Sequence, residues 1–354
     1  MSELRELNTK EQYPFLDIVK FLLALLIVCA HFISENAMGR INPLIDYLSS
    51  LYIIVVPFFF VCSGFLLFRK LDGQDDAGKV KNYCKRVLVM YMWWSALYIA
   101  FQIITWFRFG TTREEVWHYL LNAITYSTYK TIWFLPATAI GVLLTYCFYV
   151  KAGLKKTFII AIIFYIVGCM GASYSFVLSD MNFFSRCLNV YNFIFCSSRN
   201  GIFNGFPFIT LGLILSKIEK IEFSKQKRKD TILTVVLGVC FVVEALTIKT
   251  LGAINVNTLL FLFPFSYYFM RFCLGITIRQ DIKTIWLRKM SMDIFLCQRL
   301  YLSALPTLFP ESFFNQMLIG SPYVGLLFVL TVTMTTAAGL TLLSKRIKWF
   351  QQFC

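Results

Sequence analysis

The feature that most constrains this chain is a series of apolar runs, each long enough to cross a lipid bilayer, that recurs from residue 15 to residue 343. A helix needs roughly 20 apolar residues to span the hydrocarbon core, and only short polar stretches separate these runs. With 58% hydrophobic and 15% charged residues, the chain of 354 residues lacks the polar surface that covers a soluble globule. The sequence therefore predicts one all-α, polytopic membrane domain over residues 1–354, with no appended soluble domain.

The apolar runs predict about ten transmembrane helices. The predicted spans are Phe15–Ile33, Ser49–Phe68, Val87–Phe107, Thr131–Val150, Thr157–Tyr174, Gly201–Ser216, Thr231–Ile248, Val256–Ile276, Ser291–Leu308 and Pro322–Leu343. Residues 15–343 would form the bundle, and residues 1–14 and 344–354 would be cytoplasmic tails. The first run does not resemble a cleaved signal peptide, because Asp17 and Lys20 interrupt its start.

The distribution of the basic residues predicts the orientation of the bundle. The formal net charge is +15, yet Lys and Arg occupy short segments between apolar runs, which favours a topology signal over nucleic-acid binding. With the N-terminus inside, 24 of the 34 basic residues fall in the tails and inner loops. The outer loops hold only Arg40, Arg108, Arg113, Lys130, Arg186, Arg199 and Lys249. Both termini are therefore predicted to be cytoplasmic, in a multi-pass protein of the plasma membrane.

Two further patterns concern the outer side. The segment TTREEVWHYLLNAITYSTYK places apolar residues at helical spacing beside charges, which predicts an amphipathic helix in the outer interface. The chain has eleven cysteines and two histidines but no CxxC pair, so no metal site is predicted. Cys187 and Cys196, in a segment expected outside, could form a disulfide.

The first predicted helix carries three ionisable residues on one face. His31 follows Lys20 by about three helical turns, and Asp17 precedes Lys20 by about one. His31 would then stand about 16 Å further across the bilayer than Lys20, near the outer interface. Since ionisable groups inside a membrane are costly, His31 is a candidate general base. The alternative is a histidine that only hydrogen-bonds to a neighbouring helix.

The other polar residues within predicted spans are also candidates, each with a structural alternative. They are Glu244, Arg271, Asp293, Gln298 and Arg299. Glu244 and Arg271 could form a purely structural ion pair. Ser63 and Gly64 lie among aromatic residues, where small side chains allow close approach of a ligand or simply of another helix.

An ordered set of motifs resembles the membrane acyltransferase 3 family over nearly the whole chain. The motifs are FLDIVKFLLALLIVCAHF, VPFFFVCSGFLLF, KNYCKRVLVMYMWW, IWFLPATAIGVLL, RNGIFNGFPFITLGLIL and SMDIFLCQRLYL, the fifth being similar to a Gram-positive branch. Two positions depart from the family pattern. Asn82 occupies the place of one of two arginines at the third helix, and Gln298 replaces a histidine of the ninth.

The resemblance implies transfer of an acyl group, usually acetyl, from cytoplasmic acyl-CoA to a hydroxyl of an extracytoplasmic glycan. It implies His31 as the catalytic base, with Ser63 or Asn200 steadying the oxyanion. Ser63 and Gly64 would line the donor tunnel, and Lys85 and Arg86, together with Lys20, would bind acyl-CoA. The predicted acceptor-binding residues are Trp133, Arg199, Glu244 and Arg271.

The two departures leave a second function open. Some relatives in the family are membrane domains fused to amino-acid racemases, which implies a transporter or sensor of a small molecule such as an amino acid. Glu244, Arg271 and Arg299 would then form the substrate path.

Overall fold

The computed structural model describes residues 12–37, 42, 50–179, 182–195, 197, 199–251, 253, 256–279 and 282–347. Every regular element in these ranges is helical, as the apolar runs predict. The first half contains α2 (Pro14–Phe32), η1 (Ile33–Ala37), η2 (Ser50–Ile54), α4 (Val55–Phe68), α5 (Asp76–Phe109), α6 (Arg113–Thr125), α7 (Phe134–Met170), α8 (Ser175–Ser179) and α9 (Asn182–Phe195). The second half contains η3 (Gly201–Gly205), α10 (Phe206–Ser216), α11 (Lys220–Lys225), α12 (Lys227–Thr250), α13 (Leu262–Leu274), α14 (Ile282–Arg299), η4 (Leu300–Ala304), α15 (Leu305–Leu308), α16 (Phe313–Ile319) and α17 (Pro322–Arg346).

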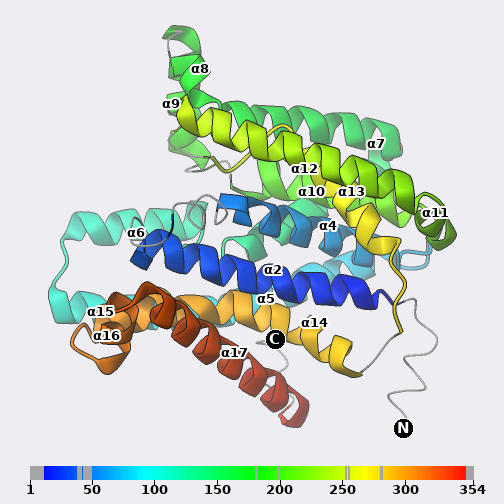
Figure 1. Cartoon of the computed structure of the whole chain (residues 1–354). Coiled ribbons are helices and arrows are strands. Elements are labelled where there is room, and N and C mark those ends of the chain that lie inside the picture. The colour runs from blue at the N-terminus through cyan, green and yellow to red at the C-terminus, as the bar shows by residue number, and fades with distance from the viewer. Residues whose placement is uncertain are drawn as a thin grey trace.

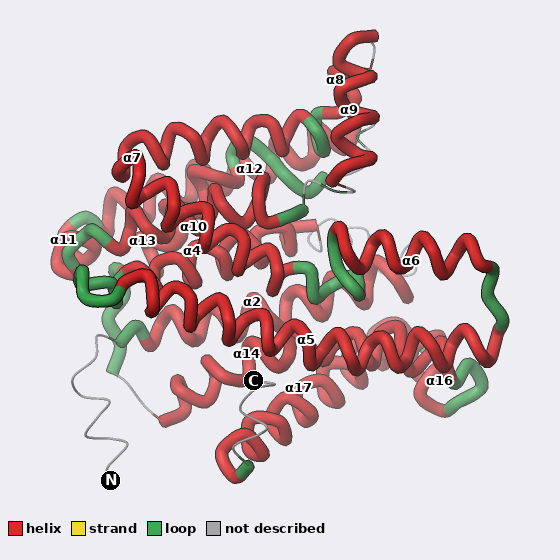
Figure 2. The backbone as a smooth tube through the Cα atoms, turned by 180° about the vertical axis from the view of Figure 1, so that it is seen from behind, coloured by secondary structure: helices red, strands yellow, loops and turns green. Residues whose placement is uncertain are grey.

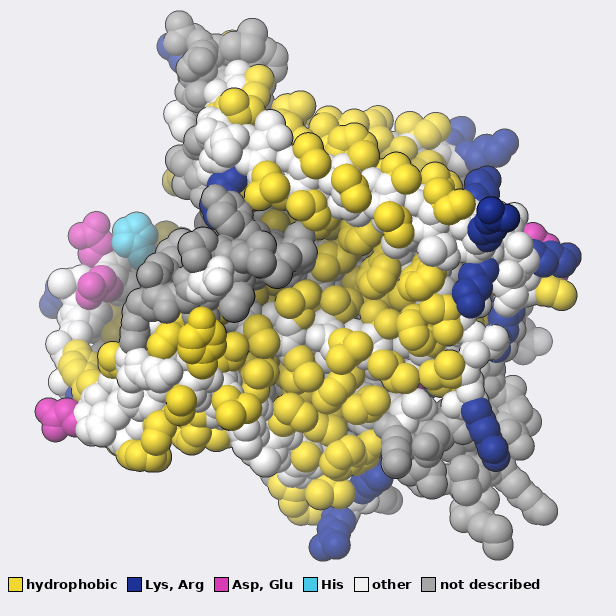
Figure 3. All heavy atoms as spheres, viewed as in Figure 1, with side chains coloured by type: hydrophobic (Ala, Val, Ile, Leu, Met, Phe, Trp, Pro, Cys, Tyr) yellow, Lys and Arg dark blue, Asp and Glu magenta, His cyan; other side chains and the backbone are white. Residues whose placement is uncertain are grey.

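Most of the long helices run side by side across the bundle, with α2, α4 and α14 near its middle (Figure 1). Helices α6, α15 and α16 lie at one end and α11 at the other, an arrangement also visible from behind (Figure 2). Figure 3 shows a broad hydrophobic face between a rim of Lys and Arg side chains at the α11 end and acidic side chains at the α6 end. We call the α11 end the inner end and the α6 end the outer end.

Five described helices are long and apolar enough to cross a membrane. They are Pro14–Ala37, Asp76–Phe109, Phe134–Met170, Lys227–Thr250 and Pro322–Arg346. Shorter apolar helices cover Tyr52–Phe68 and Gly201–Ser216. These lengths and compositions make the chain a membrane protein, while ten spans and cytoplasmic termini stay predictions.

Helix α7 reverses direction at Gly153, whose φ of 76° and ψ of 170° break the helical geometry. Glycine suits this position because side chains disfavour positive φ. Gly141 and Gly168, on either side of the reversal, both lie against the segment Gly201–Phe206. The two halves therefore return along each other, and they correspond to two separate predicted spans.

Close packing of α4 on α10 fixes the centre of the bundle. A Cβ added at Gly64 would lie 2.4 Å from the carbonyl oxygen of Ile209, and one at Gly212 would lie 2.4 Å from that of Val61. Glycines let two helix backbones approach in this way. Gly64 thus serves a helix crossing, one of the two alternatives that the sequence left open.

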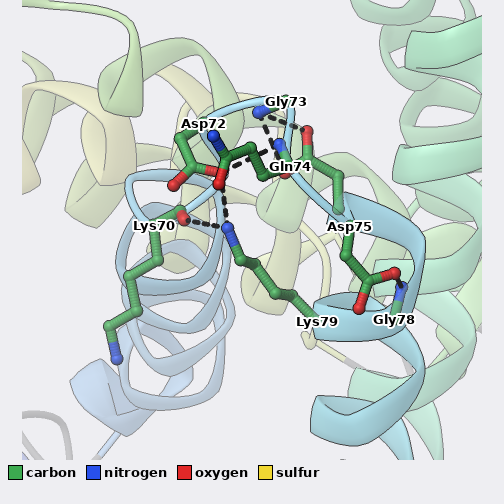
Figure 4. A network of polar contacts seen from close by, with 8 residues as sticks. Lys70, Asp72, Gly73, Gln74, Asp75, Gly78 and Lys79 are labelled. Atoms are coloured by element: carbon green, nitrogen blue, oxygen red, sulfur yellow. Dashed lines mark hydrogen bonds and ion pairs between the residues drawn. The ribbon is translucent and has the colours of Figure 1, made fainter.

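The inner loop between α4 and α5 is folded by local polar contacts (Figure 4). Lys79 Nζ lies 2.5 Å from Asp72 Oδ1, and the Asp75 side chain accepts a hydrogen bond from the Gly78 amide at the start of α5. The hydrogen bonds that Asp72 accepts from Lys79 and from the Gln74 amide hold the pKa of its carboxyl below the ordinary value. These contacts fix the turn that leads into α5.

The amphipathic segment at the outer end is a helix, as predicted. Helix α6 has a capping box, in which the Thr112 side chain and Glu115 each bind the other's backbone amide. Its apolar side chains Trp117, Leu120 and Ile124 are exposed, which suits the predicted position in the membrane interface. The proposed partner of Cys187, residue 196, lies outside the described residues.

Candidate active site

A cavity of about 240 Å³ lies at the outer end of α2. We call it the histidine cavity; its wall includes His31, Tyr52, Trp133, Asn204, Phe295 and Arg299. A second hollow of about 700 Å³, the outer vestibule, shares Tyr126, Lys130, Arg199 and Asn257 with it. Because the two hollows have walls in common, the cavity that contains His31 adjoins the outer vestibule.

The hydrogen bonds around His31 fix which ring nitrogen is free. Nδ1 of His31 lies 3.0 Å from Oε1 of Gln298, and Nε2 of Gln298 donates to the Phe295 carbonyl at 3.0 Å. Since a carbonyl oxygen only accepts, the amide nitrogen of Gln298 must face it and Oε1 must face the ring. The neutral imidazole therefore carries its hydrogen on Nδ1 and leaves the Nε2 lone pair free.

Helices α2 and α14 are joined near both ends of their contact. Towards the inner end, Arg288 Nε donates to Asp17 Oδ1 at 2.8 Å and Nη2 donates to Oδ2 at 2.7 Å. Asp17 is buried, and a two-point guanidinium–carboxylate pair fixes both distance and orientation. Towards the outer end, the contact is that of His31 with Gln298. The ion pair thus sets the register in which Gln298 meets His31.

Arg299, next to Gln298, is buried in the cavity wall and has a balanced charge. Its Nε donates to Thr131 Oγ1 at 2.7 Å, and its Nη1 pairs with the Glu35 carboxylate. Glu35 comes from the π-helical turn that follows α2, and Thr131 comes from the segment before α7. Arg299 thus connects three segments around the cavity.

Two other cations in the wall have no carboxylate partner among the described residues. Arg199 donates from Nη2 to the amide oxygen of Asn257, which is a neutral group. Lys130 is exposed at the mouth, where it lines both the histidine cavity and the outer vestibule. Within the described part of the chain, these two positive charges on the outer side of the cavity are therefore not paired with a carboxylate.

Asn204 places a side-chain amide with an unpartnered oxygen in the cavity wall. It is 3% exposed, lines the wall, and its Oδ1 is buried without a hydrogen-bond partner. The preceding Asn200 is used differently, because its Oδ1 accepts from the Ile202 and Phe203 amides and its Nδ2 donates to the Ser197 carbonyl. Asn200 therefore caps the turn that presents Asn204, and it does not line the cavity.

The structure brings together only part of the predicted site. His31, Trp133 and Arg199 line one cavity, and Gln298 and Arg299 join them from α14. Trp133 is buried, and its ring stacks on that of Tyr126 with centroids 6.0 Å apart. In the described part of the chain, no cluster of three His, Cys, Asp or Glu residues could hold a metal ion.

The residues predicted to bind acyl-CoA lie apart from this cavity, towards the inner end. Lys20 Nζ lies 5.9 Å from the ring centroid of Phe59, between α2 and α4. Ser63 hydrogen-bonds to Tyr83, over whose ring the Arg86 guanidinium lies at 5.5 Å. Lys85 is exposed near the inner end of α5. Ser63 is thus positioned beside Arg86 and not beside His31.

Glu244 and Arg271 do not form the structural ion pair that the sequence left open as one alternative. Arg271 Nε donates to Asp230 Oδ1 at 2.8 Å, in a buried pair that joins α13 to α12 near the inner end. Glu244 instead accepts from the Tyr174 hydroxyl and from the backbone amides of Leu260 and Phe261, just before α13 begins. The two residues satisfy opposite ends of the α12–α13 packing, and neither lines the histidine cavity.

Sequence reasoning missed Asn204, Lys130 and Arg288. Asn204 stands in the motif GIFNG, where an amide beside glycines in an apolar run was a usable signal. Lys130 and Arg288 were counted only as loop charges. Their roles depend on which helices are neighbours in space, and sequence spacing alone does not give that.

Comparison with known proteins gives the family. The family model described as an acyltransferase domain matches residues 13–341, which is nearly the whole chain. The chain belongs to the acyltransferase 3 family. The histidine cavity, built by α2, α14 and the segment before α7, lies entirely within the matched acyltransferase domain.

The acyltransferase domain is also similar to parts of longer curated proteins. Two are named amino-acid racemase, from Enterococcus faecalis, at 30% and 25% identity over 59% and 58% of this chain. A third, serine/alanine racemase of Enterococcus gallinarum, is 24% identical over 59% of it. These matches cover under a third of the length of each racemase-named protein. No solved structure matches the chain.

Proposed function

We propose that this membrane acyltransferase moves an acyl group, acetyl in the simplest case, from cytoplasmic acyl-CoA to a hydroxyl of an extracytoplasmic glycan. The observation that carries the proposal is the bond between His31 and Gln298, which leaves Nε2 of His31 free in a cavity that adjoins the outer vestibule. A neutral imidazole with a free nitrogen is suited to general-base work near neutral pH.

The reaction follows from that geometry. Nε2 of His31 takes the proton of the acceptor hydroxyl as its oxygen attacks the thioester carbonyl. Collapse of the tetrahedral intermediate breaks the carbon–sulfur bond, and the departing thiolate of CoA takes the proton back from Nε2. The acceptor leaves as an ester, CoA leaves as a thiol, and His31 returns to its starting tautomer.

Asn204 is the proposed donor to the oxyanion, in place of Ser63 and Asn200. It is buried in the cavity wall, and its Nδ2 group is the hydrogen-bond donor that the side chain could offer to the oxyanion. Preorganised donors of this kind stabilise developing negative charge because they do not have to reorient during the reaction. Asn200 contributes indirectly, since it caps the turn that holds Asn204.

Lys20, Lys85 and Arg86 are the proposed contacts for acyl-CoA. They lie towards the inner end of α2 and α5, whereas His31 lies at the outer end of α2. Lys20 and His31 are about 16 Å apart along the helix. An extended pantetheine arm is long enough for that separation, and the positive side chains suit the phosphates of CoA.

The test uses purified protein in liposomes that enclose radiolabelled acetyl-CoA, with isolated bacterial cell-wall glycan outside. We expect base-labile label on the glycan, above the level of protein-free liposomes. The control is protein of reversed orientation, sorted by protease access to a terminal tag. If no glycan acquires label from correctly oriented protein, the proposed transfer is wrong.

Transport or sensing of an amino acid is the second candidate. The racemase names of the three relatives favour it, although each match covers under a third of the named protein. The same liposomes distinguish the two functions. Accumulation of labelled L-serine or L-alanine, without ester formation, would support transport.

A further inference from the structure

The charges around the histidine cavity do not balance. Arg299 is neutralised by Glu35, but Arg199 and Lys130 pair with no carboxylate among the described residues. Glu35 is already paired with Arg299, and no acidic side chain belongs to the described walls of the histidine cavity or the outer vestibule. Two positive charges therefore face the route to His31.

This arrangement differs from that of two arginines at helix contacts towards the inner end. Arg271 and Arg288 each contact a carboxylate at 2.8 Å or less. Holding cations together at a partly buried surface without anions is electrostatically unfavourable. An anionic ligand that binds between Arg199 and Lys130 would remove this repulsion.

The remaining wall of the outer vestibule suits a hydroxylated molecule. Its side chains include Gln102, Asn122, Ser127, Thr128, Ser303 and Thr307, all of them neutral and able to hydrogen-bond. Burial raises the pKa of Tyr126 to about 12, so its hydroxyl also stays neutral at physiological pH and adds no opposing negative charge. The wall thus combines neutral hydrogen-bonding groups with two cations, Arg199 and Lys130, that pair with no carboxylate among the described residues.

We infer that the acceptor carries a phosphate or carboxylate close to its reacting hydroxyl, and that Arg199 and Lys130 bind this anion. The inference rests on the proposed acyl transfer and specifies the acceptor. Arg199 would supply paired guanidinium donors, and Lys130 would supply a mobile charge at the mouth. Binding of the anion there would leave the neighbouring hydroxyl free to approach Nε2 of His31.

Three small acceptors that share one carbon skeleton test the inference: glycerol, glycerol 1-phosphate and glycerate. With acetyl-CoA as donor, we expect kcat/KM to be at least about tenfold higher for the two anions than for glycerol, as one charge-assisted hydrogen bond implies. A preference for glycerol 1-phosphate over glycerate would identify phosphate as the recognised group, and the reverse would identify carboxylate. Equal rates with all three acceptors would overturn the inference.

Single substitutions distinguish binding of the anion at Arg199 and Lys130 from attraction of anions by the overall positive charge of the protein. Arg199→Ala should lower kcat/KM about 10- to 100-fold for the preferred anion and less than threefold for glycerol. Lys130→Ala, at an exposed position, should lower kcat/KM for the preferred anion more than for glycerol in the same way. Arg113→Ala removes an exposed positive charge from α6, outside the cavity wall. It should change kcat/KM neither for the preferred anion nor for glycerol. Equal losses for glycerol and the anions in Lys130→Ala would contradict the inference.

A binding measurement keeps this inference distinct from the transfer reaction. Radiolabelled glycerol 1-phosphate and glycerate are equilibrated with the protein in nanodiscs, in the absence of any acyl donor. Suppose that one of the two anions binds, that Lys130→Ala and Arg199→Ala each weaken this binding, and that no acceptor is acylated. This result would support the anion site and reject the acyltransferase mechanism. Acyl transfer without binding of either anion would support the acyltransferase mechanism and reject the anion site.

Discussion

Buried arginines differ between the two ends of this bundle. Towards the inner end, Arg271 pairs with Asp230 and Arg288 pairs with Asp17, so each cation serves the contact of two helices. At the outer end, Arg299 also pairs with a carboxylate, that of Glu35, but half-buried Arg199 contacts the neutral amide of Asn257 in the wall of the histidine cavity. The difference separates charges that hold the fold from charges that remain available to a ligand.

Replacing His31 with glutamine tests the functional side of this comparison and should have the largest effect. Glutamine keeps polarity and hydrogen bonding but accepts no proton near neutral pH, so acyl transfer should fall about 10²- to 10⁴-fold. The melting temperature and the binding of acyl-CoA should change little. Steady-state transfer and binding assays on the same preparation measure both.

His118→Gln is the matched control. His118 lies on the exposed helix α6, next to Glu114 and outside the cavity wall, so transfer should be nearly unchanged. Full transfer by His31→Gln, with loss of transfer in His118→Gln, would show that the base was assigned to the wrong histidine.

Breaking the pair of Arg271 and Asp230 tests whether the paired charges towards the inner end stabilise the fold. Asp230→Asn leaves a buried guanidinium without its carboxylate, which typically costs about 3 to 5 kcal/mol of stability. We expect a large fall in melting temperature in detergent, and any fall in transfer should follow the loss of folded protein.

A double change refines that prediction. Arg271→Met combined with Asp230→Leu removes both charges and should recover most of the lost stability, because neither partner is left unpaired. If Asp230→Asn kept full stability but lost transfer, the division between structural and functional charges would fail at this site.

Local composition explains which parts of the fold the sequence could predict. The first and last predicted spans agree with α2 and α17 to within a few residues, because a lipid environment imposes long apolar runs on the local sequence. The ion-pair prediction for Glu244 and Arg271 failed because partners depend on which helix ends are neighbours. Asp230, counted as part of an inner loop, is the true partner of Arg271.

The candidate site shows the same limit. His31 could be found from the sequence, as one of few ionisable residues inside an apolar run. Gln298 could be identified as a polar residue within a predicted span and as a departure from the family pattern, but its contact with His31 needs the packing of α2 on α14. The sequence prediction named Asn200 and not Asn204. Both residues belong to the same glycine-containing turn, and only the fold shows that Asn204 lines the cavity.

Gln298 has features of both structural and functional residues, because it is buried but also contacts His31, the proposed base. Gln298→Leu removes the acceptor for Nδ1–H and lets His31 change tautomer, so kcat should fall about 3- to 10-fold, the equivalent of one neutral hydrogen bond. KM for acyl-CoA should stay constant. Gln298→His, which restores the residue expected from the family, should retain most of the transfer because a ring nitrogen can also accept this bond. A fall in melting temperature with unchanged kcat per folded molecule would make Gln298 purely structural.

Asp72 should give the smallest effect, because its pair with Lys79 is exposed in the inner loop. The pKa of Asp72 is lowered in the folded protein, so its carboxylate favours folding above the ordinary aspartate value of about 4. That contribution is lost only as the pH falls through the lowered pKa, so it is fully present at pH 7. Solvent and salt screen the pair, and Asp72→Asn should therefore leave both transfer and melting temperature almost unchanged at pH 7. Melting curves at low and high salt measure this, and a loss of transfer in folded Asp72→Asn would show that an exposed, paired charge at the inner end also takes part in function.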